Sequence, residues 1–311
     1  MRRIDALLVL MVLIWGANYS VIKHAFREIP PQPFNALRLM IASSVFLVAI
    51  RVSRRSAGAK PGRRPGVFFT PSPVSSRELW MLVWLGFIGH FVYQYCFVGG
   101  VDQTSVSNAA LIIGITPVAV AVVSALLGRE RIGPLHWLGA AVSLAGLYAV
   151  VGHGAGFGGA TLRGDLLVMT SVACWVFYTL GATSLIARHS PLFVTGITMA
   201  IGGIPYVAAT LPQIVRMDWS HVSAWTWISL VVSALLALNV AYLIWYTGVQ
   251  KIGAARTSVY SNLVPVFAMT IAALWLGEPL DGTRILGALA VLSGVFLTRL
   301  GRKPTAVPIE E

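Results

Sequence analysis

Residues 104–127 read TSVSNAALIIGITPVAVAVVSALL, a run without a charged side chain. A helix needs about 20 apolar residues to cross the hydrocarbon core of a bilayer, so this run predicts a membrane-spanning helix. Pro117 lies near its middle, where the missing backbone donor predicts a kink. Similar apolar runs lie on both sides of it along the whole chain.

The chain contains too few charged side chains for a soluble protein. Of its 311 residues, 57% are hydrophobic and 11% are charged, whereas soluble domains carry about 25% charged residues. This composition excludes a soluble monomer and a disordered chain. The net charge of +12 comes from basic residues that lie between the apolar runs, as in cytoplasmic loops. We therefore expect a lipid bilayer, and no nucleic acid, as partner.

Ten apolar runs are long enough to cross a membrane, which predicts an all-α integral membrane protein with ten transmembrane helices. With a cytoplasmic N-terminus, the inner segments hold 17 Lys and Arg residues and the outer segments hold 5. This excess predicts a multi-pass protein of the cell (inner) membrane with both termini in the cytoplasm. The predicted spans are Ile4–Ile22, Phe34–Arg51, Leu79–Val101, Thr104–Leu127, Leu135–Val151, Asp165–Ala187, Pro191–Leu211, Val222–Val249, Ala254–Leu276 and Thr283–Leu300.

The two halves of the chain match each other under a shift of 148 residues. Because each half has five spans, the second must enter the membrane inverted, as in many secondary transporters with a solute site near the midplane. We predict five-helix repeats at 1–152, with a basic cytoplasmic loop at 52–78, and at 153–303, before a cytoplasmic tail at 304–311. The matched residues are Gly100 and Gly248, Pro117 and Pro265, Glu130 and Glu278, Gly139 and Gly287, and Gly146 and Gly294.

Several motifs, taken together, resemble a known family. They are Trp15-Gly16, Arg38-Leu39, Pro117 followed by Gly128-Arg129-Glu130-Arg131, Tyr260–Val266 and Leu276–Leu280. With the repeat, they resemble the EamA-type branch of the drug/metabolite transporter (DMT) superfamily over nearly the whole chain. The resemblance implies ten helices and, in many bacterial members, export of amino acids or other small metabolites.

Polar and aromatic side chains inside the predicted spans are the candidates for binding a solute, because such groups are costly in hydrocarbon unless they have a function or a partner. No carboxylate lies at mid-depth, which disfavours a pump that binds a cation through a buried acid. The predicted substrate-binding residues are Trp15, Asn18, Tyr19, His90, Tyr93, Gln94, Trp175, Tyr178, Asn239, Tyr242, Tyr260 and Asn262.

Several of these residues have a second interpretation. His90 is either a proton carrier and substrate partner or a packing histidine bonded to a neighbouring carbonyl. Asn239 either lines the cavity or joins two helices. Pro117 and Pro265 are either gating hinges or static kinks.

Three further residues have expected roles that follow from their depth. Arg38 lies inside a span near its outer end. One interpretation is that it snorkels to the interface or pairs with a structural partner; the other is that it attracts a substrate carboxylate. Trp245 and Tyr246 lie nearer the cytoplasmic end of their span, where we expect interfacial anchors.

The paired glycines of the fifth and tenth spans could pack helices within one chain or between chains, which leaves the oligomeric state open.

These features favour a secondary transporter that exports small organic metabolites by alternating access around a midplane cavity. Amino acids, aromatic or large neutral, are the expected solutes; transport of drugs and xenobiotics or of nucleotide sugars within the same superfamily is the alternative. The sequence has no nucleotide-binding Gly-rich loop, paired metal-binding histidines or filter loop, so we expect no enzyme, channel, metal or cofactor. A proton gradient acting through His90 and simple solute exchange are the candidate driving forces.

Overall fold

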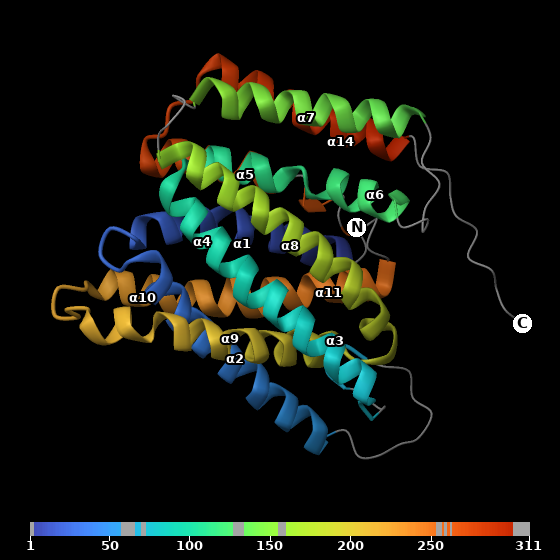
Figure 1. Ribbon diagram of the computed structural model, residues 1–311, viewed down its shortest axis with the longest axis vertical. Coiled ribbons are helices and arrows are strands. Elements are labelled where there is room, and N and C mark those ends of the chain that lie inside the picture. Colours follow the sequence, from blue (N-terminus) through green and yellow to red (C-terminus); the bar gives the residue numbers. More distant parts are fainter. Residues whose placement is uncertain are drawn as a thin grey trace, which may run out of the picture.

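The computed structural model describes residues 3–56, 66–69, 73–126, 134–154, 160–252, 257, 260–261 and 263–300. Every regular element within these ranges is a helix, and η1, η2 and η3 are π-helical (Figure 1). The elements are α1 (Arg3–Ala25), α2 (Pro31–Ser56), α3 (Ser76–Gly86), η1 (Phe87–Val92), α4 (Tyr93–Gln103), α5 (Val106–Gly114), α6 (Thr116–Leu126), α7 (Pro134–Gly154), α8 (Ala160–Arg188), α9 (Pro191–Arg216), α10 (Ala224–Ser233), η2 (Ala234–Val240), α11 (Ala241–Ile252), α13 (Val264–Ile271), η3 (Ala272–Leu276) and α14 (Gly282–Leu300).

Serine side chains fix the starts of several helices. The Ser75 hydroxyl accepts a hydrogen bond from the Glu78 amide, and the Glu78 carboxylate accepts one from the Ser75 amide. The hydroxyl groups of Ser105, Ser190 and Ser223 likewise accept hydrogen bonds from amides in the first turns of α5, α9 and α10. Each cap satisfies an N–H group that the first turn of a helix leaves without a partner.

Six helical stretches in the described residues are long and apolar enough to cross a membrane, and four apolar helices are shorter. The chain is therefore an all-helical, multi-pass membrane protein, as the composition predicts. The six long stretches are Ile4–Ala25, Pro31–Arg55, Ser76–Gln103, Leu162–Arg188, Pro191–Arg216 and Ala224–Lys251. The four short ones, Val106–Val120, Trp137–Gly146, Val264–Leu276 and Ile285–Gly294, overlap the remaining four predicted spans.

Helices from the first half of the chain pack mainly against helices from the second half. The pairs are α2 with α9, α4 with α8, α5 with α13 and α7 with α14, while α1 packs on α11 and α13. Figure 1 shows the α7–α14 pair along one edge of the molecule and α2 with α9 at the opposite edge. The remaining helices lie between these edges and enclose the core.

Glycines allow α7 and α14 to touch backbone to backbone. A Cβ atom at Gly294 would lie 2.4 Å from the Ser143 amide nitrogen, and one at Gly146 would lie 2.7 Å from the Ala290 Cβ. The Ser143 hydroxyl donates to the Val291 carbonyl oxygen at 3.1 Å. Within the chain, these glycines therefore allow α7 and α14 to pack closely.

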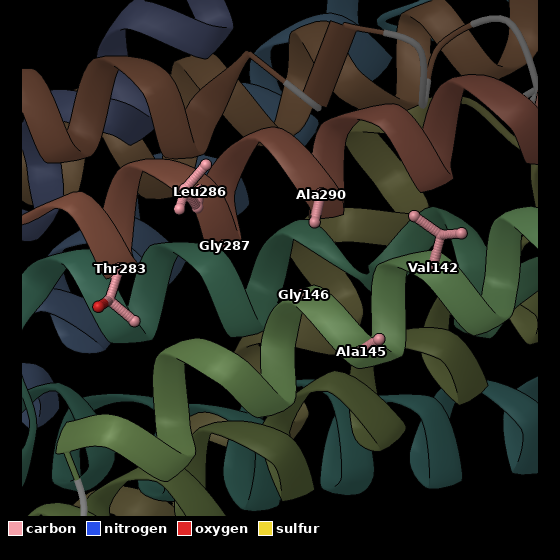
Figure 2. A pocket seen from close by; sticks show the side chains of 7 residues that line it. All are labelled: Val142, Ala145, Gly146, Thr283, Leu286, Gly287 and Ala290. Atoms are coloured by element: carbon pink, nitrogen blue, oxygen red, sulfur yellow. The ribbon is translucent and has the colours of Figure 1, made fainter.

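A groove runs along the contact between α7 and α14 (Figure 2). Its walls are almost entirely apolar, and Thr283 supplies the one hydroxyl among the lining residues. The groove follows from the small side chains at this contact and offers few groups that could recognise a polar solute. Its lining residues are Val142, Ala145, Gly146, Thr283, Leu286, Gly287 and Ala290.

Two deviations from α-helical geometry occur at matching places in the two halves. A shift of 148 residues carries η1, Phe87–Val92, onto positions 235–240, which lie within η2. The same shift carries Ile115, a single turn residue between α5 and α6, onto Leu263, the turn residue before α13. Single π-helical turns are frequent at functional sites.

The predicted proline kinks take the form of these one-residue interruptions. Pro117 and Pro265 each lie two residues after the turn residue, in the first turn of a new helical segment. A proline is tolerated there because the amide at this position has no partner within its helix. A Cβ atom on Gly114 would lie 2.8 Å from the Pro265 Cγ atom, so the two interruptions face each other across the α5–α13 contact.

Candidate functional site

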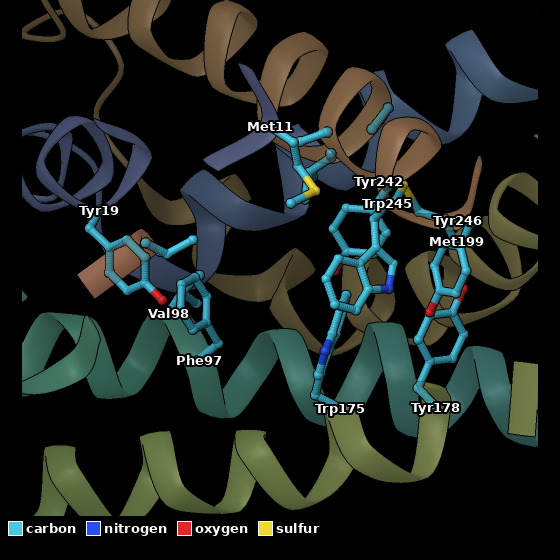
Figure 3. Packing of buried hydrophobic residues seen from close by; sticks show 14 of the residues in the cluster. Met11, Tyr19, Phe97, Val98, Trp175, Tyr178, Met199, Tyr242, Trp245 and Tyr246 are labelled. Atoms are coloured by element: carbon cyan, nitrogen blue, oxygen red, sulfur yellow. The ribbon is translucent and has the colours of Figure 1, made fainter. Parts of the chain in front are cut away.

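Four large aromatic side chains meet in the core. Trp15 of α1 and Trp175 of α8 have ring centroids 6.0 Å apart, and each lies edge-on to Tyr242 of α11, at 5.9 and 5.4 Å. The Trp245 ring lies 5.7 Å from that of Trp15 and 6.0 Å from that of Trp175. Figure 3 shows Trp175, Tyr242 and Trp245 close together. Such edge-to-face and tilted pairs are favourable arrangements of aromatic rings.

The segment formed by η1 and α4 adds further rings. The Tyr93 ring lies 5.3 Å from Trp175, and the His90 ring lies 5.7 Å from Tyr242. Trp15 and Tyr93 are partly buried, and the other side chains are buried. We call the set of Trp15, His90, Tyr93, Gln94, Trp175, Tyr178, Tyr242, Trp245 and Tyr246 the aromatic cluster.

Two members of the aromatic cluster differ from expectation. Trp245 and Tyr246 are 3% and 1% exposed, so the prediction that they anchor the chain at a membrane interface is wrong. The Tyr246 ring lies 5.7 Å from that of Tyr178, and both rings point into the core (Figure 3). Their burial follows from the packing of α11 against α1, α8 and α9.

His90 belongs to a buried network of hydroxyl groups. Its Nε2 atom lies 3.2 Å from the Tyr178 hydroxyl and 3.2 Å from the Thr198 hydroxyl, which are 2.8 Å from each other. The network therefore joins η1, α8 and α9 through side chains rather than through a neighbouring carbonyl. A neutral imidazole satisfies these contacts. Sequence reasoning missed Thr198, which carries no motif that marks it.

Buried polar atoms remain without partners inside the aromatic cluster. Among the described residues, His90 Nδ1, Gln94 Oε1 and Trp245 Nε1 have no hydrogen-bond partner. The Trp15 indole, in contrast, donates to the Ala237 carbonyl oxygen of η2 at 3.1 Å. Unpaired polar groups in a protein core are costly, so a polar solute or water entering here would gain hydrogen bonds.

Arg38 lies on the inward face of α2 and is 1% exposed, so it does not snorkel. Its Nη1 atom donates to Asn35 Oδ1 at 3.0 Å, while its Nε atom has no partner among the described residues. The guanidinium carbon lies 5.8 Å from the centre of the Phe34 ring. Of the alternatives that the sequence leaves open, the burial excludes snorkelling, and the hydrogen bond to Asn35 is a structural contact.

The other predicted site residues lie outside the aromatic cluster. Asn18 accepts a hydrogen bond from Ser233 of α10, and the Asn239 amide donates to the Ala42 carbonyl oxygen of α2 at 2.9 Å. Tyr19 packs on Phe97 at 5.5 Å. Tyr260 donates to Asp5 at 2.9 Å, at the start of α1. Asn262 lies outside the described residues.

Polar contacts tie the helix ends together at one end of the bundle. The Glu278 carboxylate accepts from the Val106 amide at 2.7 Å and from the Ser107 amide and hydroxyl at 3.1 and 2.7 Å. Lys23 Nζ donates to three carbonyl oxygens at the end of α4, at 2.5 to 2.9 Å. In the adjoining loop, the backbone N–H and the hydroxyl of Ser223 donate to Glu28 and lower the pKa of its carboxyl.

A second set of polar contacts closes the opposite ends of the same helices. Glu78, at the start of α3, lies 3.1 Å from Arg188, the last residue of α8, and 3.3 Å from His189, the next residue. The Asp5–Tyr260 hydrogen bond links the start of α1 to the chain before α13. Each contact joins segments that the alternation of predicted spans places on the same side of the membrane.

A bundle of membrane-length helices around a buried aromatic and polar cluster is the architecture of a multi-pass membrane transporter. The chain belongs to the EamA-like transporter family, whose model matches residues 2–152 and 162–300.

Relatives span the chain almost completely. An uncharacterised transporter of Bacillus subtilis, YyaM, is 27% identical over 284 residues, which cover 90% of this chain and 88% of the relative. A protein of Streptantibioticus cattleyicolor named "Probable terminal-alkyne amino-acid exporter" is 26% identical over 302 residues, covering 96% and 95%. A solved crystal structure has the same fold, with a TM-score of 0.67 and 21% identity, covering 98% of this chain and 100% of that one.

Proposed function

We propose that this chain is a secondary transporter that exports small organic metabolites, amino acids foremost, by alternating access around the aromatic cluster. The observation that carries the proposal is the cluster itself, where rings from α1, α8 and α11 meet η1 and leave polar atoms without partners. A solute with an aromatic or large apolar side chain and polar ends matches that combination.

The proposed architecture is ten membrane helices in two inverted five-helix repeats, 1–152 and 153–303. Three observations support it. The π-helical turns η1 and η2 and the interruptions at Ile115 and Leu263 are related by one shift. The family model matches two segments of the chain. Helices pair mostly across the two halves, as α2 with α9 and α7 with α14.

Alternating access needs an end that opens while the other stays closed. The Glu278 and Lys23 contacts hold one end, and the Glu78–Arg188 and Asp5–Tyr260 contacts hold the other. We propose that these two sets break in turn, and that Pro117 and Pro265 act as hinges because their interruptions touch at the α5–α13 contact. The distribution of Lys and Arg supports cytoplasmic termini in an inner cell membrane.

The proposed solutes are aromatic or large neutral amino acids. The rings of the cluster favour such side chains, and a relative of similar length carries amino-acid export in its name. Solute exchange is the proposed driving force, because the titratable side chain of His90 is bonded to hydroxyl groups and no carboxylate pairs with it among the described residues.

Counterflow in proteoliposomes tests the proposal. Vesicles are loaded with one unlabelled amino acid at a time, and entry of the labelled amino acid is followed against protein-free vesicles. We expect saturable exchange of aromatic and large neutral amino acids and little exchange of small or charged ones. Absence of exchange for every amino acid, from protein shown to be folded, contradicts the amino-acid proposal; exchange of drugs or nucleotide sugars instead would establish the alternative.

A further inference from the structure

Arg38 is a buried charge that the described chain does not neutralise. Ion pairs among the described residues involve Glu78 with Arg188 and His189, and Asp218 with His221, and none involves Arg38. Burying a charge without a counter-ion costs several kcal/mol, and intramembrane charges mark functional sites. The counter-charge therefore has to come from outside this part of the chain.

The surroundings of Arg38 place it at the edge of the aromatic cluster. Its helix, α2, packs against α4, which carries Tyr93 and Gln94 of the cluster, and against η2, which ends two residues before Tyr242. Arg38 shares the buried face of α2 with Asn35 and with Ala42, whose carbonyl receives the Asn239 amide. Its Nε atom, which has no hydrogen-bond partner among the described residues, is therefore buried on the face of α2 that meets η2.

We propose that Arg38 binds the carboxylate of the transported solute, so that the solutes of this protein carry a carboxylate beside an aromatic or large apolar group. This inference rests on the proposed transport function. A guanidinium donates two parallel hydrogen bonds to a carboxylate. The single positive charge of Arg38 balances one negative charge, whereas a phosphate dianion would need a second positive charge. The electron-rich faces of Trp15, Trp175 and Tyr242 supply a place for the ammonium group of an amino acid.

Competition in the counterflow assay tests the assignment. Exchange of labelled phenylalanine is measured with unlabelled phenylalanine, its carboxamide and phenethylamine as competitors. In the wild-type protein we expect the two compounds without a carboxylate to compete about tenfold more weakly or worse, the size of a lost charge-assisted hydrogen bond. In Arg38→Gln, the preference for the acid should collapse, while Arg38→Lys should keep part of it.

Matched variants separate binding from a structural role. Arg51→Gln, on the exposed side of the same helix, should keep the wild-type preference. Because Arg38 has no counter-ion among the described residues, Arg38→Gln should hold or raise the melting temperature in detergent; a structural arginine would lower it. Equal competition by acid and amide in the wild type, or an unchanged preference in Arg38→Gln, overturns the proposal.

A binding measurement keeps the inference testable if no amino acid is exchanged. The melting temperature of the purified protein is recorded with phenylacetate, phenylacetamide or neither. A rise with phenylacetate alone that disappears in Arg38→Gln supports the carboxylate site, even if the amino-acid proposal has failed. No rise, or the same rise in Arg38→Gln, contradicts the assignment to Arg38.

Discussion

Trp175→Ala is expected to lower solute exchange at least tenfold. Trp175 stands at the centre of the aromatic cluster, and its loss removes the surface on which an apolar solute would pack. A tenfold change in rate corresponds to roughly 1.4 kcal/mol. The stacking and burial lost with a tryptophan side chain are worth more than that. Its ring centroid lies 5.3 to 6.0 Å from those of Trp15, Tyr93, Tyr178, Tyr242 and Trp245.

Two further variants show whether such a loss arises from the site. Trp175→Phe keeps an aromatic face and should retain most of the exchange rate. Trp84→Ala removes a tryptophan of α3 that is 56% exposed and should leave exchange unchanged. Initial rates are compared at equal amounts of folded, reconstituted protein. Equal rates for Trp175→Ala and the wild type would remove the aromatic cluster from the transport path.

Gly202→Ala is expected to disrupt both packing and exchange. A Cβ atom at this position would lie 2.2 Å from the Gly86 carbonyl oxygen and 2.7 Å from the His90 Cβ atom. The α9 helix must then move away from η1, which separates Thr198 from His90. Overpacking of this kind costs about 1 to 3 kcal/mol, so the melting temperature falls and the exchange rate drops with it.

The next residue provides a closely matched control. A Cβ atom at Gly203 would meet the Ser43 hydroxyl at 3.4 Å, an ordinary contact, and alanine favours helix by about 1 kcal/mol over glycine. Gly203→Ala should therefore melt at or above the wild-type temperature and exchange solute normally. Equal melting temperatures for Gly202→Ala and Gly203→Ala would mean that α9 and η1 are not packed this tightly.

The membrane fold follows from the sequence because its signal is strong and local. Runs of about 20 apolar residues have few alternatives to a membrane helix, and Trp15 and Trp175 could be predicted as deep residues because both lie inside such runs. The repeat signal likewise marks Pro117 and Pro265. The repeat does not predict the local geometry at the two prolines. A proline removes one backbone donor, but this does not fix the residue at which the helix is interrupted.

The site was predicted less well, for physical reasons. Arg38 was weighed as a snorkelling or structurally paired residue because sequence alone does not reveal which face of α2 is covered. The interfacial position predicted for Trp245 rests on its place along the span, and a place along the chain does not reveal that α1 and α8 cover this part of α11. Tyr260 was expected near the solute, but it bonds to Asp5, a contact between residues 255 positions apart.

Solute protection of a single cysteine tests the central claim most directly. The two native cysteines, Cys96 and Cys174, are first changed to serine. Gln94 is then replaced by cysteine, because its side chain is 2% exposed and lies on the face of α4 that meets Tyr242. Labelling by a small membrane-permeant maleimide is followed with and without an amino acid that the same protein exchanges. We predict that the amino acid slows labelling in a saturable manner, at the concentrations that support exchange. Labelling at the same rate with and without that amino acid would contradict a solute site in the aromatic cluster.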